Sequence, residues 1–179
     1  DGGIFMFYVY VKKAPVREYT DDLIREEISS MDNSEAWEAL IPLTKLGKRL
    51  GELKALDVEF REKWDGIFKA HPWLDGPSDS YLGDFKVGGG ATCEHSHAIN
   101  IWHHLSIISG NGRVNYVSAD LVFKKDSDLD YDSISFVNLR SDRGLSGRVV
   151  QDVETKPHSK NVVATCERGL IKWIDLNCY

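Results

Sequence analysis

The chain has 179 residues, of which 42% are hydrophobic and 28% are charged, a composition that suits one folded domain and excludes a disordered chain. The formal net charge of -6 argues against a dedicated nucleic-acid-binding protein, so we expect no direct sequence-specific binding of nucleic acid. Three widely spaced cysteines exclude a disulfide framework and a zinc ribbon. No apolar run approaches the roughly 20 residues that a membrane-spanning helix needs.

The N-terminal part of the sequence predicts one strand followed by three helices. Residues 4–11 (IFMFYVYV) are aromatic and β-branched, which is typical of a buried strand that joins a later sheet. Residues 20–31 form a short amphipathic pattern, and a second helix follows it until Pro42 ends or kinks it. A third helix is expected from Asp57 to about His71. Its apolar stripe consists of Phe60, Trp64, Ile67 and Phe68.

The C-terminal part of the sequence changes from helical spacing to alternation. Residues 72–90 are rich in Pro, Gly, Asp and Ser and predict a loop that ends in a flexible glycine joint. GNG at residues 110–112 predicts a hairpin turn, and the RGLSG and ERG segments predict further turns. Strands are expected over residues 93–108, 113–124, 133–139, 147–153, 161–166 and 169–176.

These elements predict an α+β fold in which an N-terminal strand and three helices pack on a mostly antiparallel β-sheet formed by the C-terminal half. We expect a single domain over residues 1–179. Its parts are a strand with helices (1–71), a Pro/Gly loop (72–90) and a β-rich half (91–179).

The segment CEHSHAINIWHH, residues 93–104, contains four of the six histidines. In an extended strand, His95, His97 and His103 share one face, and an HxH pair on a strand can reach one divalent metal such as zinc, as in cupin-type barrels. Glu94 beside them is a candidate general base. The carboxylate and the later histidine that complete a cupin site are missing, so the histidines equally suit a surface that gains charge near pH 6.

The acidic run DSDLDYD at residues 126–132 resembles the start of a calcium loop but lacks its glycine and its final glutamate. We therefore interpret it as a solvated connection between strands. The sequence contains no GxSxG, no P-loop and no GxGxxG motif, so no catalytic residue is predicted outright.

A basic helix face is the remaining signal for a partner or a membrane. The leucine-rich segment after Pro42 carries lysine and arginine opposite its apolar side, and the end of the first strand adds two lysines. An aromatic residue in the Pro/Gly loop suits docking on another surface. The candidate membrane- or partner-binding residues are Lys12, Lys13, Lys45, Lys48, Arg49 and Trp73.

The order of these pieces resembles the core domain of rhabdovirus matrix proteins. The resemblance is specific over residues 4–31, where IFMFYVYVKKAPVREYTDDLI combines an aromatic strand, a basic turn and a helix entry, and it is architectural beyond them. It implies a non-enzymatic viral structural protein that self-associates and bridges an anionic membrane and a nucleocapsid or another viral protein. It further implies no cofactor and a place in the host cytoplasm, at a membrane or in the virion.

Two other functions fit the residues. One is a metal-dependent, cupin-like β-barrel enzyme centred on His95, His97 and Glu94, with His103 as a further ligand. The other is a soluble protein-binding or inhibitor module whose acidic residues 126–132 dock a basic partner.

Overall fold

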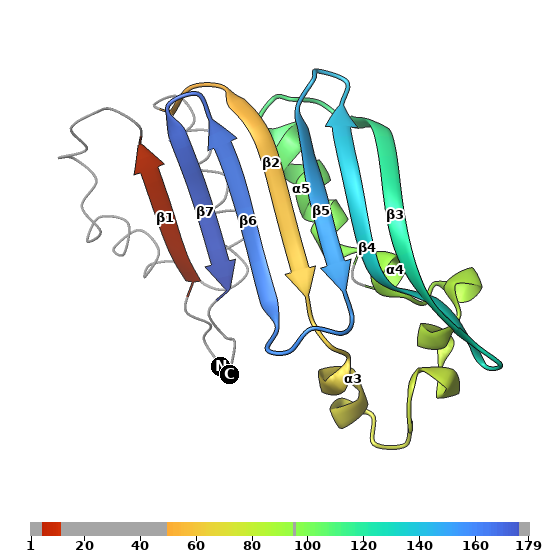
Figure 1. Ribbon diagram of the computed structural model, residues 1–179. Coiled ribbons are helices and arrows are strands. Elements are labelled where there is room, and N and C mark those ends of the chain that lie inside the picture. The colour runs from red at the N-terminus through yellow and green to blue at the C-terminus, as the bar shows by residue number, and fades with distance from the viewer. Residues whose placement is uncertain (1–4, 12–49, 95, 176–179) are drawn as a thin grey trace.

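A computed structural model describes residues 5–11, 50–94 and 96–175, and these form one seven-stranded sheet with helices on one face (Figure 1). The order of strands across the sheet is β1-β7-β6-β2-β5-β4-β3. The strands are β1 (Phe5–Val11), β2 (Leu53–Arg61), β3 (Val114–Asp126), β4 (Leu129–Ser141), β5 (Ser146–Asp152), β6 (Ser159–Cys166) and β7 (Gly169–Asp175). The helices are α3 (Asp65–Ala70), α4 (Ala91–Glu94) and α5 (His97–Ile108), with 3-10 turns η2 (Pro77–Asp79), η3 (Tyr81–Gly83) and η4 (Phe85–Val87).

The sheet is mostly antiparallel, as predicted, and the fold class α+β is confirmed. Every neighbouring pair is antiparallel except β2 and β5, which run parallel with Val58 opposite Val149. The first strand joins the sheet at its edge against β7, which confirms that prediction. The predicted helix over residues 20–31 and the part of the second helix before residue 50 lie outside the described residues. The end of the leucine-rich continuation, predicted to run to residue 56, is wrong as a helix because β2 begins at Leu53.

The third predicted helix is wrong over most of its length, because its first part is a central strand. In β2, Leu56, Val58 and Phe60 are buried while the residues between them are partly exposed, which is the alternation of a strand. Helical spacing from Phe60 to Phe68 competes with this alternation in the sequence. Only Asp65–Ala70 forms a helix.

The prediction that the histidine-rich segment forms a strand is also wrong. Residues 97–108 form helix α5, whose buried residues include Ala98, Trp102 and Leu105 at the spacing of one helical face. The GNG turn consequently links a helix to β3 and not two strands of a hairpin. The RGLSG and ERG turns do connect antiparallel neighbours, β4 to β5 and β6 to β7.

Helix α5 lies over β2 and β5 and closes the main core (Figure 1). Trp102 is fully buried, and its indole Nε1 donates a hydrogen bond of 2.7 Å to the carbonyl oxygen of Leu56. Gly147 faces this bond, since a Cβ atom at that position would collide with the Leu56 carbonyl and press on the Trp102 indole. The core therefore requires a glycine on β5 beneath the helix.

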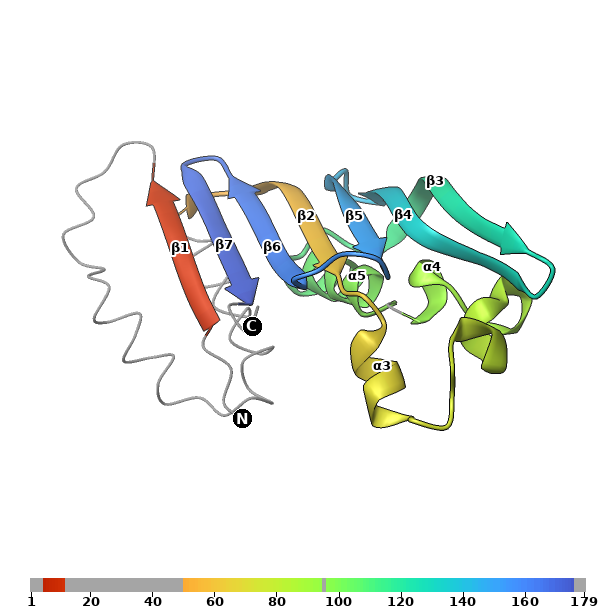
Figure 2. The same cartoon turned by 60° about the horizontal axis from the view of Figure 1, so that its bottom comes forward.

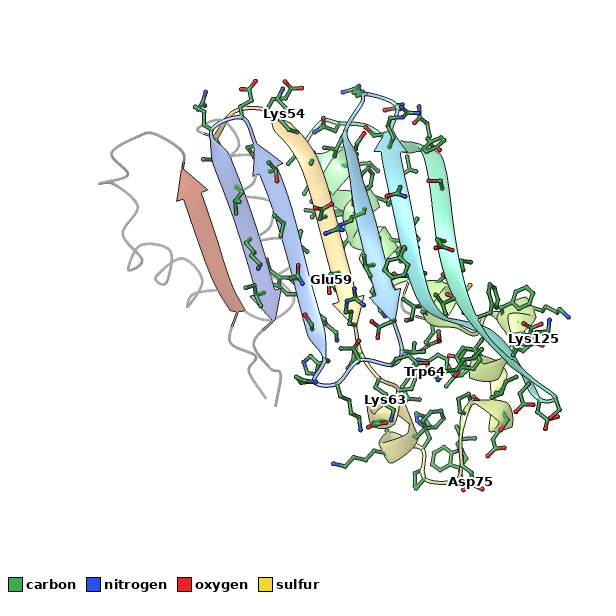
Figure 3. The ribbon with its side chains drawn as sticks, in the orientation of Figure 1. Lys54, Glu59, Lys63, Trp64, Asp75 and Lys125 are labelled. Carbon is green, nitrogen blue, oxygen red and sulfur yellow. The ribbon has the colours of Figure 1, made fainter. Side chains whose placement is uncertain are left out.

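A second, smaller core holds the residues 64–91 against the lower end of β4. Trp64 packs on Tyr131 with ring centroids 5.3 Å apart, and Leu82, Ala91 and Val153 complete the cluster. Figure 3 places Trp64 at this end of the sheet.

The opposite face of the sheet is covered by no described element (Figure 2). It carries charged side chains that pair across strands, among them Arg61 with Asp152 at 2.7 Å and Arg148 with Asp57 at 3.8 Å. Within the described residues, no helix is long and apolar enough to cross a membrane.

Candidate functional site

A polar cluster lies where the chain passes from the 3-10 turns into α4 and α5. The glycines at residues 88–90, predicted as a flexible joint, instead form a closely packed turn. Gly90 has a φ of +88°, and a Cβ at Gly89 would collide with the carbonyls of Tyr81 and Leu82. The Gly90 N–H donates to the Leu82 carbonyl at 3.2 Å. This packing fixes where α4 begins.

Asp132 ties α4 to the sheet. Its carboxylate is buried on β4, and its Oδ2 accepts hydrogen bonds from the backbone N–H of Thr92 at 2.8 Å and from the Thr92 hydroxyl at 2.6 Å. Gln151 on β5 donates from Nε2 to the Ala91 carbonyl at 3.3 Å. The acidic run predicted as a solvated connection thus supplies one buried, structural carboxylate, while Asp126 and Asp128 remain exposed as expected.

Glu94 ends α4 and is held by a tyrosine from the preceding turn. The Tyr81 hydroxyl donates to Glu94 Oε2 at 2.7 Å. This hydrogen bond to a carboxylate, helped by partial burial, raises the pKa of Tyr81, so the phenol stays protonated as a donor. One oxygen of Glu94 is therefore oriented while the carboxylate stays partly exposed.

Helix α5 begins three residues after Glu94 and presents a polar stripe. The Ser96 N–H donates to the Cys93 carbonyl at 3.3 Å, so the chain turns directly from α4 into α5. His97, Asn100 and His104 are exposed, and their spacing of three and four residues places them on one face of the helix. Together with Tyr81 and Glu94, these three residues are called the His97 face below.

The His97 face can do acid–base chemistry and bind hydroxyl groups. Imidazole is the side chain that most often serves as a general acid or base, and His97 stands in the first turn of the helix with solvent access. The Asn100 amide, one helical turn further along α5, and the Glu94 carboxylate before the helix offer the acceptors and donors that a polar small molecule needs.

The predicted metal ligands are not arranged as a strand would arrange them. On helix α5, His97 and His103 are six residues apart and point to different sides. His95 lies outside the described residues, so the three-histidine set stays a prediction. Among the residues that the structure describes, no group of three His, Cys, Asp or Glu side chains is placed to hold a metal ion.

The other predicted binding residues are not brought together by the described structure. Trp73 is 73% exposed in the loop between α3 and η2, and its ring meets His71 edge-on with centroids 5.1 Å apart. The predicted basic residues Lys12, Lys13, Lys45, Lys48 and Arg49 lie outside the described residues.

Sequence reasoning identified Glu94 and the histidines but missed Tyr81 and Asp132. Tyr81 is 13 residues before Glu94, and Asp132 is 40 residues after Thr92. Only the position of Tyr81 in a polar loop hinted at a role, and nothing distinguished Asp132 from its acidic neighbours.

Comparisons with solved structures relate the fold to dehydrogenases. GenD2 from gentamicin A biosynthesis, solved with NAD, matches with a TM-score of 0.58 and 16% identity over 76% of this chain. A myo-inositol dehydrogenase from Corynebacterium glutamicum matches with a TM-score of 0.54 and 14% identity over 76%. The WlbA dehydrogenase from Bordetella pertussis, solved with NADH and UDP-GlcNAcA, matches with a TM-score of 0.56 and 18% identity over 75%.

The chain spans only 35%, 36% and 38% of those three proteins, so the similarity is to one part of each. At sequence identities this low, the matches establish the fold alone. No protein-family model and no curated protein matches the sequence.

These matches correct the predicted function. The prediction of a viral matrix protein that forms part of the virion is wrong, because the solved structures that share the fold are dehydrogenases. The expectation of no cofactor, with zinc as the alternative, is contradicted by neighbours solved with NAD or NADH. A cupin-like barrel is also wrong, since the described sheet is open, with β1 and β3 at its edges. The resemblance over residues 4–31, the homo-oligomer, and the membrane and nucleocapsid partners stay predictions.

Proposed function

We propose that this chain is the part of a nicotinamide-dependent dehydrogenase that binds a polyhydroxylated substrate and supplies its acid–base group. The observation that carries the proposal is the fold match over about three quarters of the chain to proteins described as dehydrogenases. The His97 face supports it, because an accessible imidazole in the first turn of α5 follows, three residues along the chain, the Glu94 carboxylate that Tyr81 binds.

The described residues do not themselves fit a dinucleotide. Dinucleotide-binding folds use parallel strands joined through helices, with a glycine-rich turn that holds the pyrophosphate. Here only β2 and β5 are parallel, and no GxGxxG motif occurs in the sequence. Under the proposal the nucleotide is bound outside this chain's described residues, by the part of the enzyme that corresponds to the unmatched length of its neighbours.

The substrate class follows from the chemistry of the His97 face and agrees with the neighbours. Oxidation of an alcohol to a carbonyl transfers a hydride to the nicotinamide and requires that the hydroxyl proton be removed. Of the two exposed histidines of this face, His97 lies nearer to Glu94 in the chain and is assigned as the base that accepts the proton. Tyr81 holds Glu94 at 2.7 Å, leaving carboxylate lone pairs free to accept hydrogen bonds from further hydroxyls. Neighbours named for myo-inositol and solved with a nucleotide sugar point to the same kind of ligand.

The test is steady-state turnover of the whole polypeptide that carries this chain. NAD⁺ and NADP⁺ are supplied with a panel of cyclitols, sugar alcohols and nucleotide sugars, and formation of reduced nicotinamide is followed by absorbance. We expect turnover with at least one member of the panel. His97→Asn should lower kcat/KM by about a hundredfold or more, since general base catalysis contributes on that order.

His158→Asn is the matched control, because His158 lies in the loop between β5 and β6 and not on the His97 face. It should leave kcat/KM unchanged. A polypeptide that neither binds nor reduces either nucleotide would contradict the proposal, as would equal activities of the two histidine variants.

A further inference from the structure

The edge strand β3 is long and exposes apolar side chains. It has 13 residues and lies at one end of the sheet, and no described residue pairs with its outer side. Leu121, Val122 and Phe123 are 36%, 44% and 44% exposed. An edge of this length with apolar side chains is a template for pairing with another strand.

If β3 pairs with β3 of a second copy, the two strands are related by a two-fold axis. Antiparallel pairing about a two-fold axis normal to the sheet keeps each side chain on its own face, so the axis passes through a residue. Residues equally far from that axis, one from each copy, then lie opposite one another. The charge pattern of the strand decides which residue can lie on the axis.

An axis through Val122 gives a self-complementary pairing. Asp120 of each copy lies opposite Lys124 of the other, so the same ion pair forms on both sides of the axis. Between these pairs, Leu121 lies opposite Phe123, and the Val122 side chains meet on the axis. In the sequence DLVFK, residues 120–124, an acidic residue and a basic residue thus flank three apolar ones. This arrangement brings opposite charges together in two-fold antiparallel pairing.

Neighbouring registers lack this match. An axis through Phe123 places Asp120 opposite Asp126, and an axis through Asp120 places that carboxylate opposite its own copy. An axis through Leu121 sets Lys124 opposite Ser118 and forms no ion pair. Of these positions only Val122 brings opposite charges together.

Two of the residues that the pairing uses already have contacts within the chain, since Lys124 pairs with Glu154 and the Phe123 ring meets Phe85 edge-on with centroids 5.6 Å apart. The Asp120 carboxylate has no hydrogen-bond or ion-pair partner among the described residues, while its backbone lies in the ladder with β4 opposite Phe136. Lys124 pairs with Glu154 of its own chain, across the sheet and away from the outer edge. A lysine on an edge strand usually opposes association. Here the Lys124 ammonium would lie between its own Glu154 and the partner's Asp120, and these carboxylates neutralise it. Lys125 is already engaged with Asp130 at 3.1 Å, near the end of the hairpin (Figure 3).

We propose that β3 is the interface of a homodimer in which two copies pair antiparallel about Val122 and extend the sheet from one protomer into the next. The proposed interface is separate from the His97 face and stands whether or not the chain belongs to a dehydrogenase.

The test is sedimentation velocity of the full 179-residue chain over a wide concentration range. The wild-type chain should show a reversible monomer–dimer equilibrium. Asp120→Lys sets lysine against lysine on both sides of the axis and should raise the dimer dissociation constant by roughly tenfold or more. Lys124→Asp should do the same by setting aspartate against aspartate. Asp75→Lys, on the loop labelled in Figure 3, is the matched charge reversal away from β3 and should leave the constant unchanged.

A mixture of the two β3 variants gives the most direct test of the pairing. In a heterodimer of Asp120→Lys with Lys124→Asp, both contacts again join opposite charges, so the mixture should dimerise more tightly than either variant alone. Circular dichroism melts check that each variant is folded. The proposal is overturned by a wild-type chain that stays monomeric, by a dimer that both variants leave intact, or by a mixture no tighter than its components.

Discussion

Replacing the buried carboxylate of Asp132 should measure how firmly the sheet holds the His97 face. Oδ2 of Asp132, a residue that is 3% exposed, accepts two hydrogen bonds from Thr92, at 2.8 and 2.6 Å. Hydrogen bonds to a charged group contribute about 1.5–3 kcal/mol each, and asparagine keeps the shape and one acceptor oxygen. We therefore expect Asp132→Asn to lower the free energy of unfolding by about 2–3 kcal/mol.

A double-mutant cycle with Thr92→Val isolates the interaction. Thr92→Val removes only the hydroxyl donor and should cost about 1–1.5 kcal/mol. If the contact is as described, the cycle gives a coupling energy on the order of 1 kcal/mol in urea unfolding. Thr165→Val on the exposed side of β6 is the matched control and should be nearly neutral. Costs of Asp132→Asn and Thr92→Val that add to within about 0.3 kcal/mol would refute the contact.

Three further changes test the core and the site. Trp102→Phe leaves the Leu56 carbonyl unpaired and opens a cavity, so urea unfolding should show a loss of about 2–4 kcal/mol, and a loss below about 1 kcal/mol would disprove that bond. Asp152→Asn should remove stability at neutral pH and flatten its fall below about pH 4, a dependence that a pH series of urea melts would detect. Tyr81→Phe should remove a tyrosine whose pKa is raised by its hydrogen bond to Glu94, so absorbance titration near 295 nm should lose amplitude above the ordinary tyrosine pKa. A loss of amplitude at the ordinary tyrosine pKa would contradict the hydrogen bond.

The sign of the Asp152 prediction follows from its surroundings. Burial alone would raise its pKa, but Arg61 at 2.7 Å, two backbone N–H groups and the Thr155 hydroxyl together hold the pKa below its ordinary value. A carboxyl with a depressed pKa stabilises the folded state above the unfolded-state pKa, and this contribution is lost as pH falls through the folded-state pKa. Acid stability equal in the wild type and in Asp152→Asn would exclude this role.

The later strands could be predicted because alternation and turn residues agree. In β4 the buried residues Val137 and Leu139 alternate with the exposed Asn138 and Arg140, and the RGLSG turn sets where β4 ends and β5 begins. Residues 53–61 fit two periods at once, since Phe60 belongs both to an alternating set and to a helical one that runs on to Phe68. Pairing with β5 and β6 on either side decides in favour of the strand, and sequence alone does not contain that information.

Helix α5 could not be predicted from the sequence because its composition favours a strand. Ile99, Ile101 and Ile107 favour strands by propensity, and the HxH pattern suggested a metal-binding strand. Burial of Trp102 against β2 selects the helix, because tertiary packing overrides a local preference. Glu94 and His97 could be named from sequence because both are near one another in the chain. Tyr81 and Asp132 could not, because the turn and the sheet bring them to the site from a distance.

A crystal structure of the whole polypeptide with NAD⁺ and a polyol that it oxidises would test the central claim most directly. The account predicts that the nucleotide is bound outside the residues described here and that a substrate hydroxyl lies within hydrogen-bond distance of the His97 imidazole, with other hydroxyls near Glu94. A substrate bound away from the His97 face, or no nucleotide bound at all, would contradict it.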